Sequence, residues 1–467
     1  MQRRKTTTTT VGNIGIGGDN PIRIQSMTTT NTNDTEACVA QAKRIIDAGG
    51  ELVRLTTQGS REAKNMENIS ATLKAEGYMQ PLVADVHFNA NVADVAALYC
   101  EKVRVNPGNY VDPARTFRKL EYTDEEYAAE LKKIEERFVP FLNICKEHHT
   151  AIRIGVNHGS LSDRIMSRYG DTPEGIVESC MEFLRICKKE QFNNVVLSIK
   201  ASNTVVMVTS VRLLVKAMDA EDMHYPLHLG VTEAGEGEDG RIKSAVGIGA
   251  LLTEGIGDTI RVSLSEEPEC EIPVARKLVN FIPECAEKRE HADINADGTL
   301  TLSFAENNME DLQLKAAMTA GALLIDRHAT DLIINNEGCG TAEELQSLAD
   351  SILQAARVRF TKTEYISCPG CGRTLYDLQG TIARIKAAVK AAAETDKRFS
   401  TLKIGIMGCI VNGPGEMADA DYGYVGAGPN RISLYKGKTC VEKAIPEEHA
   451  VERLLKFIKE DLTPSLS

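Results

Sequence analysis

The sequence predicts an α/β protein in which an N-terminal (β/α)8 barrel is followed by a short middle segment and a C-terminal α/β domain that carries cysteines. Eight short β-branched or apolar runs recur through the first 265 residues, most of them separated by helix-like stretches. This is the count and size of a parallel (β/α)8, or TIM, barrel. The signal weakens over residues 266–355, and the composition changes to the cysteine region at residues 356–467. A doubly wound parallel sheet is the rival architecture.

The predicted barrel strands share β-branched or apolar composition and a polar or charged residue close to their ends. They are residues 22–27, 52–56, 82–86, 103–106, 152–156, 195–199, 227–231 and 260–264. Residues 122–137, in the fourth unit, are rich in acids and lysine and predict a solvated amphipathic helix without a catalytic role.

Two glycine-rich stretches need an interpretation. The glycines of residues 12–18 look like a dinucleotide fingerprint, but a strand-like run follows them where that fingerprint requires a helix. A hairpin turn is therefore favoured. Gly247 and Gly249 stand near another predicted helix start, where they would either present N–H groups to a phosphate or allow close packing.

Regular structure is harder to find after the barrel. The middle segment shows one αβ-like unit, a helix over 311–324 leading to a strand over 331–335. The cysteine region has an alanine-rich helix over 380–394 and a last helix after Pro446.

Composition limits the classes of function. The net charge of -12 and the pI near 5.4 argue against general nucleic-acid or membrane-surface binding, so any cationic cluster must be local and suggests a small anionic ligand. The twelve cysteines are scattered and no signal peptide precedes them, which predicts a reducing cytoplasm. No apolar run approaches the roughly 20 residues that span a bilayer.

Cations recur where the predicted strands end. Strand residues i and i+2 face the same side, and several units place a cation at i and a small polar group at i+2. The pairs are Arg54 with Thr56, Arg104 with Asn106, Lys200 with Ser202 and Arg261 with Ser263; Arg153 precedes Asn157 in a longer version, and Asp85 with His87 makes a similar couple. A single such arginine usually forms a salt bridge. In a barrel, however, all of them would converge on the C-terminal mouth, where guanidinium groups suit a diphosphate.

Glu233 ends the seventh predicted strand within this positive field. It would either balance the arginines or donate a proton to a leaving oxygen. The sequence leaves both interpretations open.

Three cysteines predict an iron–sulfur site with one open iron. Cys368 and Cys371 lie in Ser-Cys-Pro-Gly-Cys-Gly-Arg, and Cys409 lies in Gly-Cys-Ile-Val-Asn-Gly-Pro-Gly-Glu, where a glycine-rich turn would bring Glu416 back to the metal. A structural zinc knuckle competes, but it normally needs a fourth thiolate or imidazole, and Cys440 lacks a partner at ligand spacing. Inert core cysteines are disfavoured, because buried thiols need no flanking glycine and proline.

With these motifs, the chain resembles the 4-hydroxy-3-methylbut-2-enyl diphosphate synthase family, iron–sulfur enzymes of the methylerythritol phosphate route to isoprenoids. The specific matches are Lys-Thr-Glu-Tyr-Ile-Ser-Cys-Pro-Gly-Cys-Gly-Arg-Thr-Leu, Gly-Cys-Ile-Val-Asn-Gly-Pro-Gly-Glu and Leu-Gly-Val-Thr-Glu-Ala-Gly, supported by Val-Arg-Val-Asn-Pro-Gly-Asn. The resemblance implies reductive ring opening and dehydroxylation of 2-C-methyl-D-erythritol 2,4-cyclodiphosphate, with electrons from ferredoxin or flavodoxin delivered one at a time through a [4Fe–4S] cluster.

The resemblance also implies roles for individual residues. Cys368, Cys371 and Cys409 would hold the cluster, with Glu416 as a displaceable fourth ligand, Asn412 beside the substrate and Glu233 as the acid. The diphosphate would be held by Arg54, Asp85, His87, Arg104, Asn106, Arg153, Asn157, Lys200, Ser202, Arg261 and Ser263.

The implied domains are a substrate-binding barrel at 1–265, an insert at 266–355 and a cluster domain at 356–467, the last similar to the repeat of sulfite and nitrite reductases. The insert is shorter than in the three-domain form of the family, which makes the chain either a naturally shortened form or an incomplete sequence. A homodimer is expected, although an insert would allow the site to close within one chain. Two alternative functions remain. One is an iron–sulfur reductase of another small anion, and the other is a redox-sensing or zinc-stabilised barrel that binds a phosphorylated metabolite.

Overall fold

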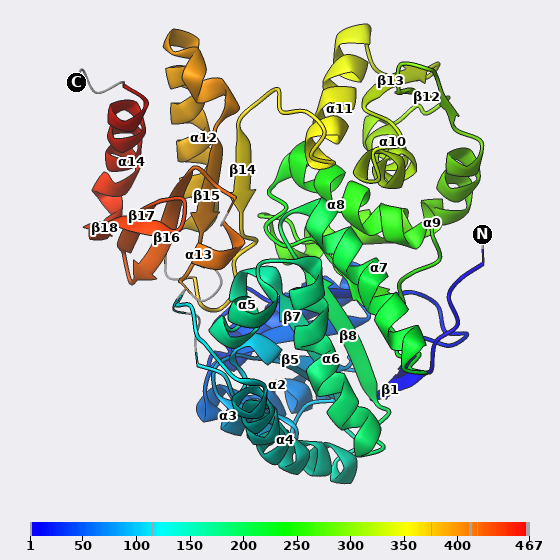
Figure 1. Ribbon diagram of the computed structural model, residues 1–467, viewed down its shortest axis with the longest axis vertical. Helices are drawn as coiled ribbons and strands as arrows, with labels where there is room; N and C mark the ends of the chain where they lie inside the picture. The colour runs from blue at the N-terminus through cyan, green and yellow to red at the C-terminus, as the bar shows by residue number, and fades with distance from the viewer. Residues whose placement is uncertain are drawn as a thin grey trace.

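A closed parallel barrel forms the N-terminal half of the molecule (Figure 1). The structure is a computed structural model that describes residues 2–113, 116, 118–374, 376–410, 413–417 and 419–463. Neighbouring strands follow the order β8-β7-β6-β5-β4-β3-β10-β9, and a parallel bridge between Leu197 and Leu227 closes the ring. The strands are β3 (Arg23–Met27), β4 (Leu52–Thr57), β5 (Leu82–Val86), β6 (Lys102–Val105), β7 (Ala151–Asn157), β8 (Val195–Lys200), β9 (His228–Leu229) and β10 (Thr259–Ile260). The predicted (β/α)8 barrel is confirmed, and the doubly wound sheet is excluded.

The last two barrel strands are shorter than predicted. β9 and β10 are regular over two residues each, against predicted runs of five. Gly230, directly after β9, leaves room for the side chain of Lys200, since a Cβ there would lie 2.7 Å from Lys200 Nζ. Glu233 then adopts a left-handed backbone with φ 49°. These segments therefore line the barrel mouth as loops.

Helices cover the outside of the barrel, as each βα unit requires. They are α1 (Thr35–Asp47), α2 (Ser60–Ala75), α3 (Ala90–Ala96), α4 (Asp124–Glu147), α5 (Asp163–Tyr169), α6 (Pro173–Lys189), α7 (Thr204–Ala220) and α8 (Gly237–Leu252). The predicted solvated helix is the first half of α4, whose inner face is not solvated, because Tyr127 and Ile134 are buried. Within the described ranges, no helix combines the length and apolar composition needed to cross a membrane.

A hairpin seals the bottom of the barrel. β1 (Thr9–Val11) pairs antiparallel with β2 (Ile14–Ile16), and Gly12 in the turn has a φ of 55°. Val11 and Ile16 are fully buried against the lower ends of the barrel strands. The predicted hairpin turn is confirmed.

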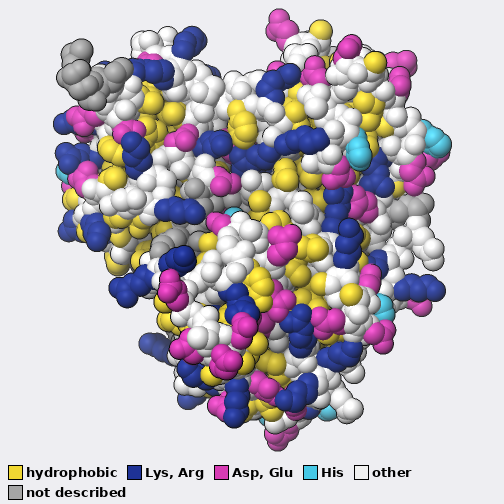
Figure 2. Space-filling model, in the orientation of Figure 1, with side chains coloured by type: hydrophobic (Ala, Val, Ile, Leu, Met, Phe, Trp, Pro, Cys, Tyr) yellow, Lys and Arg dark blue, Asp and Glu magenta, His cyan; other side chains and the backbone are white. Residues whose placement is uncertain are grey.

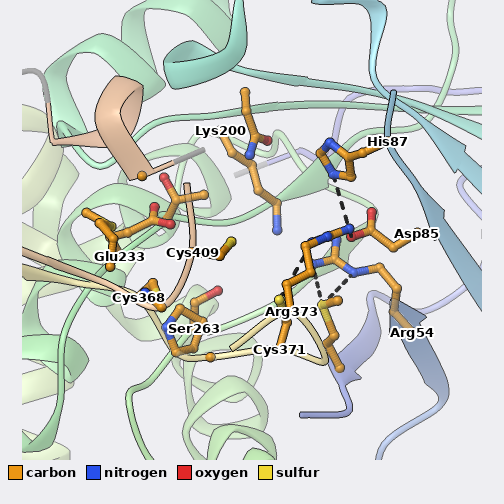
Figure 3. A pocket seen from close by; sticks show the side chains of 18 of the residues that line it. Arg54, Asp85, His87, Lys200, Glu233, Ser263, Cys368, Cys371, Arg373 and Cys409 are labelled. Carbon is orange, nitrogen blue, oxygen red and sulfur yellow. Dashed lines mark hydrogen bonds and ion pairs between the residues drawn. The ribbon is translucent and has the colours of Figure 1, made fainter. Parts of the chain in front are cut away.

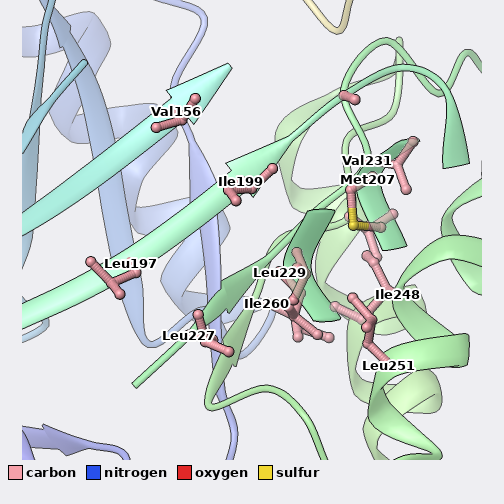
Figure 4. Packing of buried hydrophobic residues seen from close by; sticks show 14 of the residues in the cluster. Val156, Leu197, Ile199, Met207, Leu227, Leu229, Val231, Ile248, Leu251 and Ile260 are labelled. Carbon is pink, nitrogen blue, oxygen red and sulfur yellow. The ribbon is translucent and has the colours of Figure 1, made fainter. Parts of the chain in front are cut away.

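Apolar packing holds the barrel wall against α7 and α8. Figure 4 shows Leu229 and Ile260 packed towards Ile248 and Leu251 of α8. Gly247 and Gly249 lie inside α8, away from its N-terminus, so they do not present N–H groups to a phosphate. Their function is close packing, since a Cβ would lie 2.6 Å from a side-chain atom of Val231 or of Met318, respectively.

The middle segment builds a small α/β unit against α8. It contains α9 (Glu271–Glu290), β11 (Asp293–Ile294), β12 (Thr299–Phe304), α10 (Met309–Ile325), β13 (Asp331–Asn336) and α11 (Ala342–Ala355). The three strands form one sheet in the order β11-β12-β13. α10 crosses α8 closely, because Gly321 brings its backbone next to Val246. The predicted helix and strand are confirmed, and the remaining elements were not expected.

The C-terminal domain is a five-stranded mixed sheet with helices on one face. Its strands are β14 (Glu364–Ser367), β15 (Lys403–Met407), β16 (Tyr422–Gly428), β17 (Arg431–Lys436) and β18 (Thr439–Pro446), in that order. α12 (Leu378–Thr395) and α14 (Glu447–Leu462) confirm the two predicted helices, and both pack on the sheet through an apolar core of their own. Figure 1 shows this domain and the middle segment side by side above the barrel.

Candidate active site between the barrel and the cysteine domain

The topology of the C-terminal sheet brings two of the cysteines together. β14 and β15 are parallel neighbours, and Cys368 and Cys409 follow their carboxyl ends. A parallel bridge between Ser367 and Ala234 of the barrel attaches this end of β14 to the loop after β9. The carboxyl ends of both sheets therefore face one another, where α/β proteins place their ligand sites.

One pocket lies at this junction, and both domains contribute to it (Figure 3). The barrel provides most of the cationic and polar side chains, and the C-terminal domain provides the cysteines and Arg373. The lining residues are Met27, Arg54, Asp85, His87, Arg104, Asn157, Lys200, Thr232, Glu233, Arg261, Ser263, Cys368, Pro369, Gly370, Cys371, Arg373, Met407, Gly408, Cys409 and Gly413. All three predicted cysteines and eight of the eleven predicted anion-binding residues line this pocket.

Three buried cations of the barrel interior, two of which line the pocket, have no carboxylate partner within the part of the chain that the structure describes. Arg54 contacts only the sulfur of Met27, at 2.9 and 3.1 Å, and Nε and Nη1 of Arg153 lack any hydrogen-bond partner. Burial and neighbouring cations lower the pKa of Arg54 to about 10 and the pKa of Lys200 well below its usual value. Buried charges are normally paired, so the site is built to receive an anion.

Two further arginines are held by carboxylates. Asp85 accepts from Arg104 at 3.0 Å, and Glu271 accepts from Arg261 at 2.9 and 3.0 Å. Burial alone would raise the pKa of Asp85, but Arg54 and Arg104 hold that pKa well below its usual range. These pairs fix the direction in which the guanidinium groups point.

The cations that line the pocket are buried in the barrel mouth. Acidic and basic side chains are interspersed over the face seen in Figure 2. The local cationic cluster that the acidic composition allowed is therefore the barrel mouth.

Two buried carboxyl groups lie close to each other at the pocket, and Glu233 is the one that lines it. Glu233 is buried, and its Oε2 has no hydrogen-bond partner. Glu416, at the end of α13 (Gly413–Glu416), accepts from Thr232 Oγ1 at 2.9 Å through Oε2, while its buried Oε1 is unpartnered. Burial raises the pKa of both groups, and the proximity of Glu233 raises that of Glu416 further.

Some predicted site residues have other contacts. Asn106 donates to Ser160 Oγ at 2.8 Å, Ser202 donates to the backbone oxygen of Glu416 at 2.9 Å, and Arg153 lies fully buried. They do not line the pocket, so their predicted contact with substrate stays a prediction. Asn412 lies outside the described residues.

The cysteine side of the pocket fits an iron–sulfur cluster. The backbone N–H of Gly408 donates to Cys368 Sγ at 3.2 Å and Arg373 donates to Cys371 Sγ at 3.6 Å, as cluster thiolates require. Burial and Glu233 raise the pKa of Cys368, so its thiolate needs a metal to take the negative charge. Among the described residues, no three potential ligands converge on a single-ion site. A cluster does not need such convergence, because each thiolate binds a different iron.

Several residues of the site were missed by sequence reasoning. Arg373 and Thr232 line the pocket, and Glu271 holds Arg261 from the start of α9. Lys102, fully buried below the mouth, contacts only Gln25 Oε1, at 3.4 Å. The pattern of a cation at i and a small polar group at i+2 identified the site residues at the strand ends. No sequence pattern identifies residues that reach the site from distant segments of the chain.

The fold and the site together define a TIM-barrel protein whose cationic mouth is closed by a cysteine-bearing domain. This chain belongs to the GcpE family. The family model described as "GcpE TIM-barrel domain" matches residues 6–276, and the model described as "GcpE protein C-terminal domain" matches residues 364–460.

The chain is similar to named relatives over nearly its whole length. It is 52% identical to the 4-hydroxy-3-methylbut-2-en-1-yl diphosphate synthase (flavodoxin) of Bacteroides thetaiotaomicron, with 98% of each chain covered. It is 51% identical to the protein of the same name from Bacteroides fragilis strain ATCC 25285, with 100% of this chain and 98% of that protein covered. These alignments run over 607 and 618 residues, whereas the chain has 467, so both relatives carry residues without a counterpart here.

The similarities to solved structures include distant ones. An N-acetylneuraminic acid synthetase from Leptospira borgpetersenii aligns with a TM-score of 0.39 at 12% identity, covering 62% of this chain and 93% of that one. A similarity this weak has no bearing on function.

Proposed function

We propose that this protein is a 4-hydroxy-3-methylbut-2-enyl diphosphate synthase, which reductively opens the ring of 2-C-methyl-D-erythritol 2,4-cyclodiphosphate and removes water. The observation that supports this most strongly is the pocket in which Arg54 and Lys200, buried and without a carboxylate partner among the described residues, lie opposite three cysteines. The cations suit a diphosphate, and the cysteines suit an iron–sulfur cluster. The names of the two Bacteroides relatives agree with this function.

The barrel residues bind and orient the diphosphate. Arg54 and Lys200, without carboxylate partners in the described structure, meet the phosphate charge, and Arg104 and Arg261 add donors that their carboxylates hold in fixed directions. Asn157 and Ser263 complete the rim with neutral donors. Closing the C-terminal domain over this mouth excludes water, which strengthens each of these contacts.

Cys368, Cys371 and Cys409 would hold a [4Fe–4S] cluster, which supplies electrons one at a time and offers one iron not bound by cysteine. Glu416 is the candidate for the fourth position, because its buried Oε1 has no hydrogen-bond partner and its Oε2 accepts from Thr232, which lines the pocket. Thr232 holds its other oxygen, so the carboxyl group keeps its place whether or not it binds metal.

Glu233 holds the proton for the leaving oxygen. Burial raises the pKa of this carboxyl, which favours its protonated form, and its Oε2 is unpartnered in a residue that lines the pocket. The strained left-handed backbone at this residue aims the side chain into the pocket. We infer that a flavodoxin delivers the electrons, as the relatives' names state for those proteins.

The test is turnover of the cyclic diphosphate by anaerobically purified protein with a chemical reductant. Wild-type protein should convert it, and Glu416→Ala should keep its iron and sulfide while losing most turnover. Full turnover by that variant would remove the role proposed for this carboxylate. A protein with a full cluster but no turnover would point to a reductase of another small anion, and zinc without sulfide would point to a zinc-stabilised barrel.

A further inference from the structure

Arg373 is the one cation lining the pocket that comes from the C-terminal domain, among the residues that the structure describes. It follows the second cysteine of the motif and is 9% exposed. Its Nη2 donates to Asp85 Oδ2 of the barrel at 3.3 Å, and its Nη1 donates to Cys371 Sγ at 3.6 Å. Figure 3 shows the side chain extending from the cysteine loop towards Asp85.

Asp85 has an unusual place for an acid, since it lines a site built for an anion. Its Oδ1 accepts from Arg104 at 3.0 Å, while His87 lies 3.7 Å from Oδ2. A carboxylate here would repel a phosphate unless its charge were neutralised. Asp85 therefore acts as a counter-ion that holds one arginine from each domain side by side.

We propose that Arg373 is a positioning residue that joins the two halves of the site. It docks the cysteine loop on the barrel through Asp85, adds a donor for a diphosphate next to Arg104, and places positive charge beside the Cys371 sulfur. A cation at that sulfur stabilises the more negative, reduced cluster, so the same side chain favours anion binding and electron uptake. This inference rests on the proposed function for the presence of the cluster.

The test compares Arg373→Gln and Arg373→Lys with a matched control, Arg384→Gln. Arg384 is an arginine of the same domain on α12, bonded to Thr381 and Glu447 away from the pocket. Two quantities are measured on anaerobically prepared holoprotein: the midpoint potential of the cluster by redox titration followed by electron paramagnetic resonance, and the affinity for inorganic pyrophosphate by calorimetry. Neither depends on turnover.

Arg373→Gln should move the midpoint potential to a more negative value and weaken pyrophosphate binding about tenfold, the loss expected for one charge-assisted contact. Arg373→Lys should keep the potential near that of the wild type, because the charge remains. It should lose affinity, because a single ammonium cannot reach both domains. Arg384→Gln should match the wild type in both measurements.

Wild-type potential and affinity in Arg373→Gln would overturn the proposal. If Arg373→Gln fails to hold a cluster, the test uses Arg373→Lys instead. A pyrophosphate affinity of Arg373→Lys equal to that of the wild type would then overturn the bridging role. Absence of a cluster from the wild type would instead contradict the proposed function, so the two failures are distinguishable.

Discussion

Buried side chains without partners indicate what this site binds. Arg54, Arg153 and Lys200 carry charge into the interior of the barrel without a carboxylate in ion-pair range among the described residues. Sequence reasoning identified these cations, because strand periodicity places i and i+2 on one face. It missed Arg373, whose partner Asp85 is 288 positions away, since only the folded chain brings the two together.

Glu233 is predicted to supply the proton to the leaving oxygen. Glu233→Gln keeps the shape of the side chain but cannot release a proton, so kcat should fall about a thousandfold, within the usual range for general acids. Steady-state kinetics on protein with the same iron content would measure this.

The control is Glu238→Gln, a change of the same kind at an exposed position of α8, which should leave kcat unchanged. An unchanged kcat in Glu233→Gln would favour the other interpretation of the sequence, in which this acid only balances the arginines.

Lys102 is predicted to lower the stability of the fold. It is fully buried with only a 3.4 Å contact to Gln25, and burial and Arg153 lower its pKa well below the usual value. Below the unfolded pKa of about 10.4 the unfolded chain binds a proton that the folded chain does not, so stability falls as the pH falls. Lys102→Met should raise the free energy of unfolding near pH 7 by about 2 kcal/mol.

The gain should be smaller at about pH 9.5, where the unfolded lysine begins to lose its proton. Anaerobic urea unfolding at the two pH values would measure it. Lys132→Met is the control, since Lys132 is 76% exposed on α4. Equal or lower stability of Lys102→Met at both pH values would contradict the prediction that this lysine destabilises the fold.

The helices and strands place the site residues at the carboxyl ends of parallel strands, both in the barrel and in the C-terminal sheet. All eight barrel strands were predictable because β-branched runs recur at regular spacing. β11, β12 and α11 of the middle segment were not, because burial against α8 and α10, rather than local pattern, holds that unit together.

The contact between α13 and the loop after β7 is a second docking point between the domains. A Cβ on Gly415 would lie 1.6 Å from the backbone oxygen of Gly159, and a Cβ on Gly159 would lie 2.5 Å from the backbone nitrogen of Glu416. Gly415→Ala should therefore displace Glu416 and lower kcat/KM about a hundredfold, the effect of a misplacement of about 1 Å.

Iron content and kinetics, measured together, test this prediction, and the iron content should be unchanged. Gly428→Ala is the matched control, because nothing lies within 4 Å of its Cβ position. Wild-type kcat/KM in Gly415→Ala would show that the close approach is not required.

For the whole molecule, the main consequence of the structure is that both halves of the site come from one chain. The bridge from Ala234 to Ser367, the pair of Arg373 with Asp85 and the bond from Ser202 to Glu416 all join the C-terminal domain to its own barrel. The middle segment, packed on α8, connects the two in sequence. A homodimer stays a prediction, but the pocket does not require a second chain.

Complementation between two inactive variants tests this account most directly. Glu233→Gln disables the barrel half and Cys371→Ser disables the cysteine half, and the two are mixed or co-expressed before turnover is measured. A site built within one chain predicts activity no higher than the sum of the separate variants. If each site combined the barrel of one chain with the cysteine domain of its partner, random pairing of the two variants would restore about a quarter of wild-type activity. That result would contradict a site built within one chain.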